Sequence, residues 1–106
     1  MPFINTELID EKEVIAGFRQ RFFHSENMTF AYYRVVAGDL LPEHSHPHEQ
    51  VVNVIEGQFR LSIEGEAETL TPGKVAVIHK DALHSGEAIT DCRIIDVFYP
   101  VRTDYR

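Results

Sequence analysis

The segment "GDLLPEHSHPHEQVVNVIEG", residues 38–57, concentrates three of the six histidines of the chain just before an apolar run. His44 and His46 are one residue apart, so an extended backbone places both imidazoles on the same face. Gln50 follows after a further even step and can share that face. His48 has the same parity, but it follows a proline in a predicted loop, and we expect it to be a poorer ligand.

A second segment, "GKVAVIHKDALHSG" at residues 73–86, places His84 at the end of a predicted hairpin. Three neutral imidazoles and one oxygen donor suit manganese, iron, cobalt, nickel or zinc. The spacing of the first segment alone leaves a second interpretation open, in which it is a histidine-rich surface loop that binds no metal.

Outward from these segments, apolar and polar residues alternate with a period of two, as in strands with one buried face. The clearest example is "QFRLSI", residues 58–63. Seven or so such runs, separated by regular turns, predict an all-β sandwich or barrel. The exception is "DEKEVIA", residues 10–16, which could form one short N-terminal helix ended by Gly17.

Composition sets the class of protein and the partners that it excludes. A chain of 106 residues predicts one domain spanning residues 1–106. Its single cysteine precludes an internal disulfide and favours a reducing compartment, so we expect a cytoplasmic location. No basic start precedes an apolar run, and no run approaches the ~20 residues that cross a bilayer. The net charge of −7 argues against a nucleic-acid partner.

The spacing from Gly38 through His44, His46 and Gln50 to Gly57 resembles the first motif of the cupin superfamily. Glutamine stands there in the place of the usual glutamate. The resemblance implies a double-stranded β-helix, or jelly-roll, barrel that encloses one divalent transition metal: nickel, zinc, manganese, iron or cobalt.

The stretch from Gly73 to His84 resembles the second cupin motif, with two departures. His79 stands where proline is usual, and Ala88 occupies the closing asparagine position. His79 could line the mouth of the barrel or simply end its strand. Together the two motifs imply a metal held by His44, His46, Gln50 and His84.

The tail "IIDVFYPVRTDYR", residues 94–106, resembles the close of the KdgF-type pectin-degradation cupins. Those enzymes open cyclic 4,5-unsaturated uronates, left by pectate and alginate lyases, into linear 5-keto-4-deoxyuronates. The resemblance implies that Asp96 and Arg102 are catalytic, that Arg102 binds the substrate carboxylate, and that Phe98 lines the pocket.

Strand parity in this tail agrees with an inward Asp96. Asp96 and Phe98 share one face of "IIDVFY", so the carboxylate points into the barrel. A buried charge needs a partner or a function, and the structural alternative is a bond to backbone or to an arginine such as Arg34. Arg102 follows a proline that ends the strand, which places it near a rim, where it could also be a solvated surface residue.

The expected activity is a metal-dependent ring opening without oxidation. A neutral Gln50 leaves the metal more electrophilic than glutamate would, which suits a Lewis acid. The alternatives are a metal-dependent dioxygenase or oxidase of the small-cupin type, and a sugar-binding cupin without catalysis. One of Arg19 and Arg21 could also point inward, toward an anionic sugar.

The partners expected are a small anionic sugar and a second copy of the chain, with no nucleic acid and no membrane. Small cupins commonly pair, and the outward side chains of two predicted strands form an apolar sheet face. Its members are Val51, Ile55, Ile95 and Val97.

Overall fold

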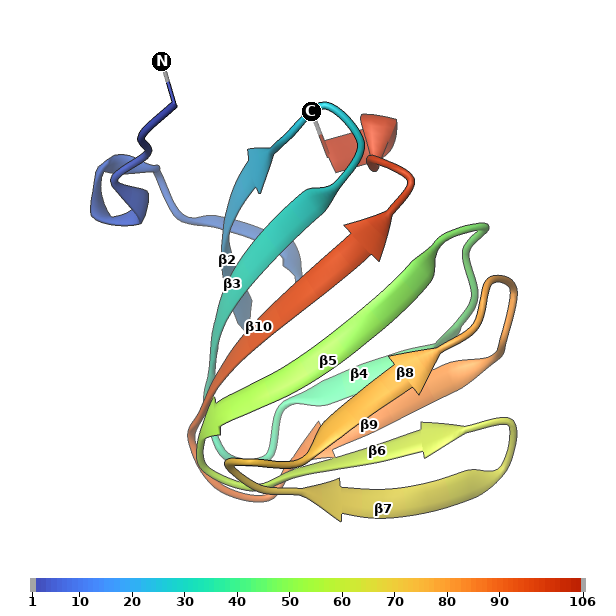
Figure 1. Cartoon of the computed structure of the whole chain (residues 1–106). Coiled ribbons are helices and arrows are strands. Elements are labelled where there is room, and N and C mark those ends of the chain that lie inside the picture. Colours follow the sequence, from blue (N-terminus) through green and yellow to red (C-terminus); the bar gives the residue numbers. More distant parts are fainter. Residues whose placement is uncertain (1, 106) are drawn as a thin grey trace.

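The computed structural model describes residues 2–105, which form ten strands in two antiparallel sheets (Figure 1). The strands are β1 (Lys12–Ile15), β2 (Phe18–His24), β3 (Thr29–Val35), β4 (Leu40–His44), β5 (Glu49–Glu56), β6 (Phe59–Ile63), β7 (Glu66–Leu70), β8 (Val75–Ile78), β9 (His84–Ala88) and β10 (Cys92–Tyr99). Two short 3-10 helices flank them, η1 (Thr6–Leu8) and η2 (Thr103–Tyr105).

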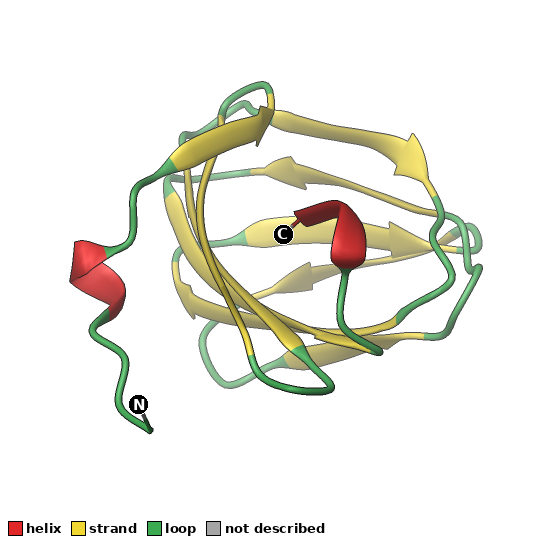
Figure 2. Cartoon of the chain, turned by 90° about the horizontal axis from the view of Figure 1, so that it is seen from above, coloured by secondary structure: helices red, strands yellow, loops and turns green. Residues whose placement is uncertain are grey.

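The sheets are built from strands that are distant in sequence. The larger sheet has the order β1-β2-β3-β10-β5-β8, and the smaller one has the order β4-β9-β6-β7. Seen from above, the strands enclose a central space, and η2 lies across its end (Figure 2). This arrangement confirms the predicted all-β jelly-roll barrel.

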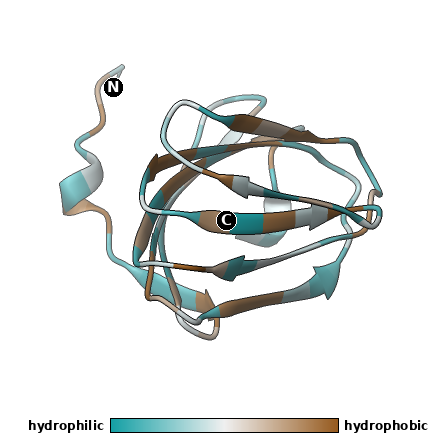
Figure 3. Cartoon of the chain, turned by 90° about the horizontal axis from the view of Figure 1, so that it is seen from below, coloured by the Kyte–Doolittle hydropathy of each residue, from teal (hydrophilic) through white to brown (hydrophobic). Residues whose placement is uncertain are grey.

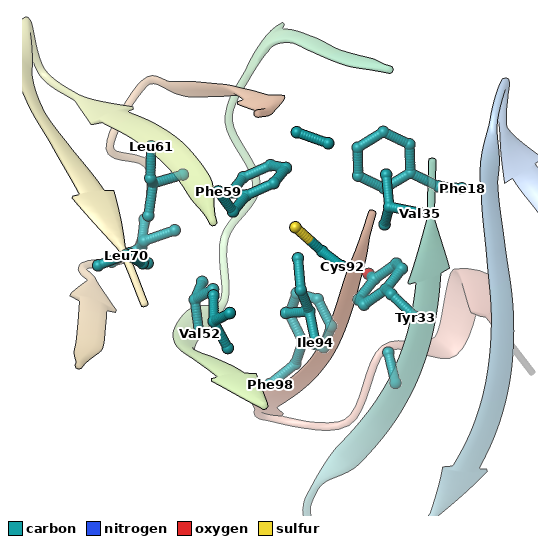
Figure 4. Packing of buried hydrophobic residues seen from close by; sticks show 14 of the residues in the cluster. Phe18, Tyr33, Val35, Val52, Phe59, Leu61, Leu70, Cys92, Ile94 and Phe98 are labelled. Carbon is teal, nitrogen blue, oxygen red and sulfur yellow. The ribbon is translucent and has the colours of Figure 1, made fainter. Parts of the chain in front are cut away.

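The core lies between the two sheets and follows the period of two. The strands carry both apolar and polar residues (Figure 3), and alternate apolar residues point into the core. Val52, Val54 and Ile94 are buried, whereas their sequence neighbours face outward. Figure 4 shows this cluster, in which the Phe18 ring meets Phe59 edge-on with the ring centroids 6.2 Å apart.

The predicted helix at residues 10–16 is wrong, because Lys12–Ile15 form strand β1 and Ala16 lies in the turn that follows. β1 pairs with β2, with Lys12 opposite Gln20 and Ile15 opposite Phe18. Gly17 adopts a positive φ of 84°, which closes the tight turn between the two strands. Pairing with a neighbouring strand outweighed the weak local helix signal.

Within residues 2–105, helices are confined to η1 and η2, which are three residues long each. Neither is long and apolar enough to cross a membrane.

Candidate metal centre

Three histidines converge inside the barrel because β4 and β9 are neighbours. His44 ends β4 and His84 begins β9, and the two residues pair directly across the sheet. Their ring centroids are 4.2 Å apart, and the ring of His46, in the loop after β4, lies 5.0 Å from that of His84. The potential ligand atoms of these three residues all lie within 4.8 Å of one another.

Backbone carbonyls fix the ring orientation of two of these histidines. Nδ1 of His44 donates to the Pro42 carbonyl over 2.8 Å, and Nδ1 of His84 donates to the Ala82 carbonyl over 2.9 Å. In a neutral imidazole, this leaves the lone pair on Nε2. Nε2 of His84 is buried and has no hydrogen-bond partner. These rings therefore present electron pairs to the centre, as metal-binding histidines do.

The environment favours the neutral form of the buried imidazoles. Burial, assisted by the charge of Arg102, lowers the pKa of His46 to about 4. Burial also lowers the pKa of His84. Only neutral imidazole coordinates a metal, so the three histidines could hold a metal ion.

Gln50, near the start of β5, lies between the histidines and a carboxylate. Its amide oxygen is 3.0 Å from Nε2 of His46, and its amide nitrogen donates to Oδ2 of Asp96 over 2.6 Å. These two contacts fix which end of the amide faces the histidines. Gln50 is buried, so the group beside Asp96 is an uncharged amide and not a second carboxylate.

Asp96 points into the barrel from β10, the strand beside β5. Its other oxygen, Oδ1, is buried and has no partner. Burial raises the pKa of Asp96 to about 7, against the opposing effects of the Gln50 hydrogen bond and the charge of Arg102. The structural alternative that involves Arg34 is wrong, because Arg34 forms an ion pair with Glu11 over 2.8 Å on the outer surface.

Arg102 is more enclosed than its place after a proline suggests. Its side chain is only 10% exposed, and its guanidinium donates to Asp104 from Nη2 over 2.7 Å and from Nε over 3.3 Å. The guanidinium carbon lies 3.9 Å from the ring centroid of Tyr105 and 4.8 Å from that of Phe98. The interpretation of Arg102 as a solvated surface residue is therefore wrong.

These side chains line one cavity of about 30 Å³. Phe98 is 1% exposed and separates Arg102 from the histidines, with its ring centroid 5.6 Å from that of His46. The residues with polar side chains that line the cavity are His44, His46, Gln50, His84, Asp96, Arg102, Tyr33 and Tyr105.

Four other candidates lie outside this cavity. His48 is half-buried, with its ring centroid 5.5 Å from that of His46, but it is not part of the three-histidine cluster. His79 is exposed at the end of β8. Arg19 is exposed, and Arg21 is directed to the surface, where its Nε donates to the Ile9 carbonyl. Neither arginine lines the cavity.

Tyr33 and Tyr105 also line the cavity; the sequence favoured a core or interface position for Tyr33 and gave no indication for Tyr105. Tyr33 is on the inward face of β3, a position that strand parity could have indicated. Tyr105 reaches the cavity because η2 folds back over the barrel, and no local pattern predicts such a return.

Comparison with protein families identifies the fold family. The family model for the cupin domain matches residues 31–98, which hold the three histidines and Gln50. The chain belongs to the cupin family. A search of the curated proteins found no match.

Solved structures support this cupin assignment over nearly the whole chain. The structure of KdgF from Halomonas sp. is 30% identical, with a TM-score of 0.89, and the match covers 98% of this chain and 96% of that one. An RmlC-like cupin from Shewanella frigidimarina NCIMB 400 is 23% identical, with a TM-score of 0.92 over 100% of this chain and 96% of that one. An oxalate decarboxylase variant of Bacillus subtilis is 18% identical over 92% of this chain and 29% of that one, with a TM-score of 0.82, a likeness of fold alone. The protein is therefore a small cupin that resembles KdgF.

Proposed function

We propose that this cupin opens cyclic 4,5-unsaturated uronates to linear 5-keto-4-deoxyuronates, with one divalent transition metal held by His44, His46, Gln50 and His84. The observation that carries the proposal is the placement of Asp96. Its carboxyl group shares a cavity with the three histidines, is linked to His46 through Gln50, and keeps one oxygen unpaired.

Gln50 fits a fourth ligand on geometric grounds. Two donor atoms ~2.1 Å from a shared metal and at right angles to each other are about 3 Å apart. The 3.0 Å between the Gln50 amide oxygen and Nε2 of His46 has that spacing. When bound, such a metal would supply Lewis acidity that stabilises negative charge on a substrate oxygen.

The reaction is an isomerisation in which one proton moves and nothing is oxidised. The C1 hydroxyl of the cyclic hemiacetal loses a proton, and the bond between C1 and the ring oxygen breaks to give an aldehyde. The ring oxygen stays on C5 as an enolate, and protonation at C4 converts that enolate to the ketone. Asp96 can accept the first proton on Oδ1 and return it to C4, because its other oxygen stays anchored to Gln50.

The remaining residues orient the substrate. The Arg102 guanidinium suits the C6 carboxylate, because planar donors match the two oxygens of that group. Phe98 excludes water between Arg102 and His46, which strengthens charge interactions in the cavity. The 30% identity with KdgF over 98% of the chain supports this assignment. The tail that resembles the KdgF-type cupins, residues 94–106, carries Asp96, Phe98 and Arg102.

The test measures the loss of the conjugated alkene's ultraviolet absorbance with metal-loaded protein. We expect turnover above the spontaneous rate, without oxygen consumption, and little turnover after chelation. In Asp96→Asn the rate should fall by about 10²- to 10⁴-fold, because the substitution keeps the shape and removes the base. Asp10→Asn, at an exposed aspartate, is the matched control and should keep the parent rate.

Three results would contradict the proposal. Turnover that never exceeds the spontaneous rate would refute the activity, and stoichiometric oxygen consumption would favour a dioxygenase or oxidase. A folded, metal-loaded Asp96→Asn protein with the parent rate would remove Asp96 from the mechanism.

A further inference from the structure

A chain of hydrogen bonds starts and ends on the segment that carries Arg102. The backbone N–H of Arg102 donates to the Thr29 hydroxyl oxygen over 2.8 Å, and that oxygen lies 2.8 Å from Nδ1 of His24. Nε2 of His24 lies 3.3 Å from the Tyr105 carbonyl oxygen. The end of β2 and the start of β3 therefore hold both ends of residues 102–105.

The direction of each bond follows from the chemistry of the partners. A carbonyl oxygen only accepts, so Nε2 of His24 carries a hydrogen and donates a hydrogen bond to the Tyr105 carbonyl oxygen. In the tautomer that carries its only hydrogen on Nε2, Nδ1 accepts a hydrogen bond from the Thr29 hydroxyl. The Thr29 oxygen in turn accepts from the N–H of Arg102. One arrangement satisfies all three bonds.

The Arg102–Thr29 bond is screened from water, and the two bonds of His24 are partly screened. Thr29 is fully buried and His24 is half-buried. The ring of Tyr105 packs against that of Phe22 on β2, with centroids 4.6 Å apart. When a buried hydrogen bond breaks, its donor and acceptor are left unpaired, because no water replaces the lost partner. The network therefore resists displacement of residues 102–105.

The side chain of Arg102 is held from a different direction. Asp104 engages the edge formed by Nε and Nη2, and Tyr105 packs against the guanidinium face. Nη1 is the guanidinium nitrogen that Asp104 does not engage, and Arg102 lines the cavity. The position of the Arg102 guanidinium therefore depends both on the hydrogen bond between its backbone and Thr29 and on its ion pair with Asp104.

We propose that His24 and Thr29 are positioning residues that set where Arg102 meets the carboxylate of an anionic ligand. The proposal rests on the carboxylate-binding role of Arg102 in the proposed function. Neither His24 nor Thr29 lines the cavity, so both act through the segment that carries Arg102. Guanidinium–carboxylate recognition requires a fixed geometry, so a shift of the backbone at Arg102 weakens it.

Thr29→Val tests the proposal because it removes the hydroxyl at nearly constant volume. We expect the KM for the unsaturated uronate to rise about 10-fold, the effect of losing a supporting hydrogen-bond partner. The kcat should change by less than about threefold, because the reacting atoms and Asp96 are untouched. Thr29→Ser keeps the hydroxyl and should restore the parent KM. Metal content should be the same in all three proteins.

Thr90→Val is the matched control. The Thr90 hydroxyl also accepts from a backbone N–H, that of Gln58, and donates to a carbonyl, that of Asp91, but it lies away from the cavity. Its removal should leave the KM unchanged. His24→Phe, which breaks the same network from the other residue, serves if Thr29→Val fails to fold, and it should raise the KM in the same way.

Amide hydrogen exchange at Arg102 separates this proposal from the proposed function. In the parent and in Thr29→Ser the amide should be protected, and in Thr29→Val protection should fall, whether or not uronates are opened. Equal protection in all three proteins overturns the anchor. An unchanged KM in folded Thr29→Val, or a joint loss of kcat and metal, overturns the positioning role. A parent protein without turnover, but with the expected exchange pattern, refutes only the activity.

Discussion

Gln50 shows why this site carries an amide where the family motif usually has glutamate. Its nitrogen donates to Asp96 over 2.6 Å while its oxygen faces His46. A carboxylate at position 50 would offer no donor, and two negative charges would meet in a buried space. The amide therefore allows Asp96 to sit beside the histidines, and the same residue serves both halves of the site.

Removal of a single histidine should empty the metal site. His84 is 1% exposed, and its Nε2 has no protein partner. We expect His84→Ala to lose most of the bound metal, measured by elemental analysis after purification, whereas the parent carries about one metal per chain. His79→Ala, at an exposed histidine, is the control and should keep its metal. Full occupancy in His84→Ala would rule out the proposed ligand set.

Asp96 should make the stability of the metal-free protein depend on pH. Burial raises its pKa from 3.8 to about 7, so the folded state favours the protonated carboxyl. The contribution of the protonated Asp96 to the free energy of unfolding is fully present below about pH 4 and is lost as the pH rises through 7. Asp96→Asn should therefore gain stability relative to the parent between pH 5 and 8, by on the order of a few kcal/mol. A constant difference between their melting temperatures across this range would contradict the assignment.

Local spacing was sufficient to place His44 and His46 on one strand face, whereas the resemblance to the cupin motifs was needed to add His84. His44 and His46 share a strand face by parity, and the structure places His84 beside them. The burial of Arg102 was not predictable in this way, because it depends on η2 folding back over the barrel. The hydrogen-bond partner of Asp96 was also missed, because Gln50 is 46 residues away in sequence and only the pairing of β5 with β10 brings the two together.

At the scale of elements, β9 can reach the site because one of its residues lacks a side chain. A Cβ at Gly86 would collide with the ring of Phe59 on β6, the strand that pairs with β9. The glycine lets the large aromatic ring fill the core while His84, two residues earlier, keeps its place on the same inward face. Packing of β6 against β9 and the position of a histidine are thus linked.

Gly86→Ala should destabilise the protein by about 1–3 kcal/mol, the usual cost of overpacking a core. Urea denaturation measures this free energy of unfolding. Phe59→Leu in the same chain should recover part of the loss, because the shorter side chain vacates the space that the new methyl group needs. Strictly additive effects of the two substitutions would show that they do not share that space.

The same scale shows why the short N-terminal helix was predicted where a strand forms. Residues 10–16 contain charged residues that tolerate a helix, and the run is too short for its pattern to decide between the two. The segment becomes a strand because it pairs with the free edge of β2, whose other edge is paired with β3. β-Strand identity at a sheet edge is set by the neighbour and not by the segment itself.

At the scale of the whole molecule, the outer face of the six-stranded sheet carries an apolar row. Val97 pairs with Phe30 on one side and Val51 on the other, and Val51 pairs with Val77. Phe23 extends this row across β2 and stacks on Phe30, with ring centroids 4.7 Å apart. Val77 is exposed and the other four residues are half-buried, and a contiguous, partly exposed apolar surface of this kind is typical of an association site.

We expect this face to form a homodimer, and light scattering at micromolar concentration should give twice the chain mass. Val51→Lys places a charge in the centre of the row and should shift the mass toward the monomer. Val36→Lys, at an exposed valine outside the row, should leave the dimer intact. A parent protein with a monomeric mass would contradict the expectation.

β10 is the last strand of the described chain, yet it lies in the middle of the larger sheet, between β3 and β5. During synthesis, those two strands therefore lack their common neighbour until residues 92–99 have emerged. Pairing between residues so distant in sequence is slow, because the loops must close before the contacts form. Asp96 lies on β10, so the candidate site is complete only when the larger sheet is complete.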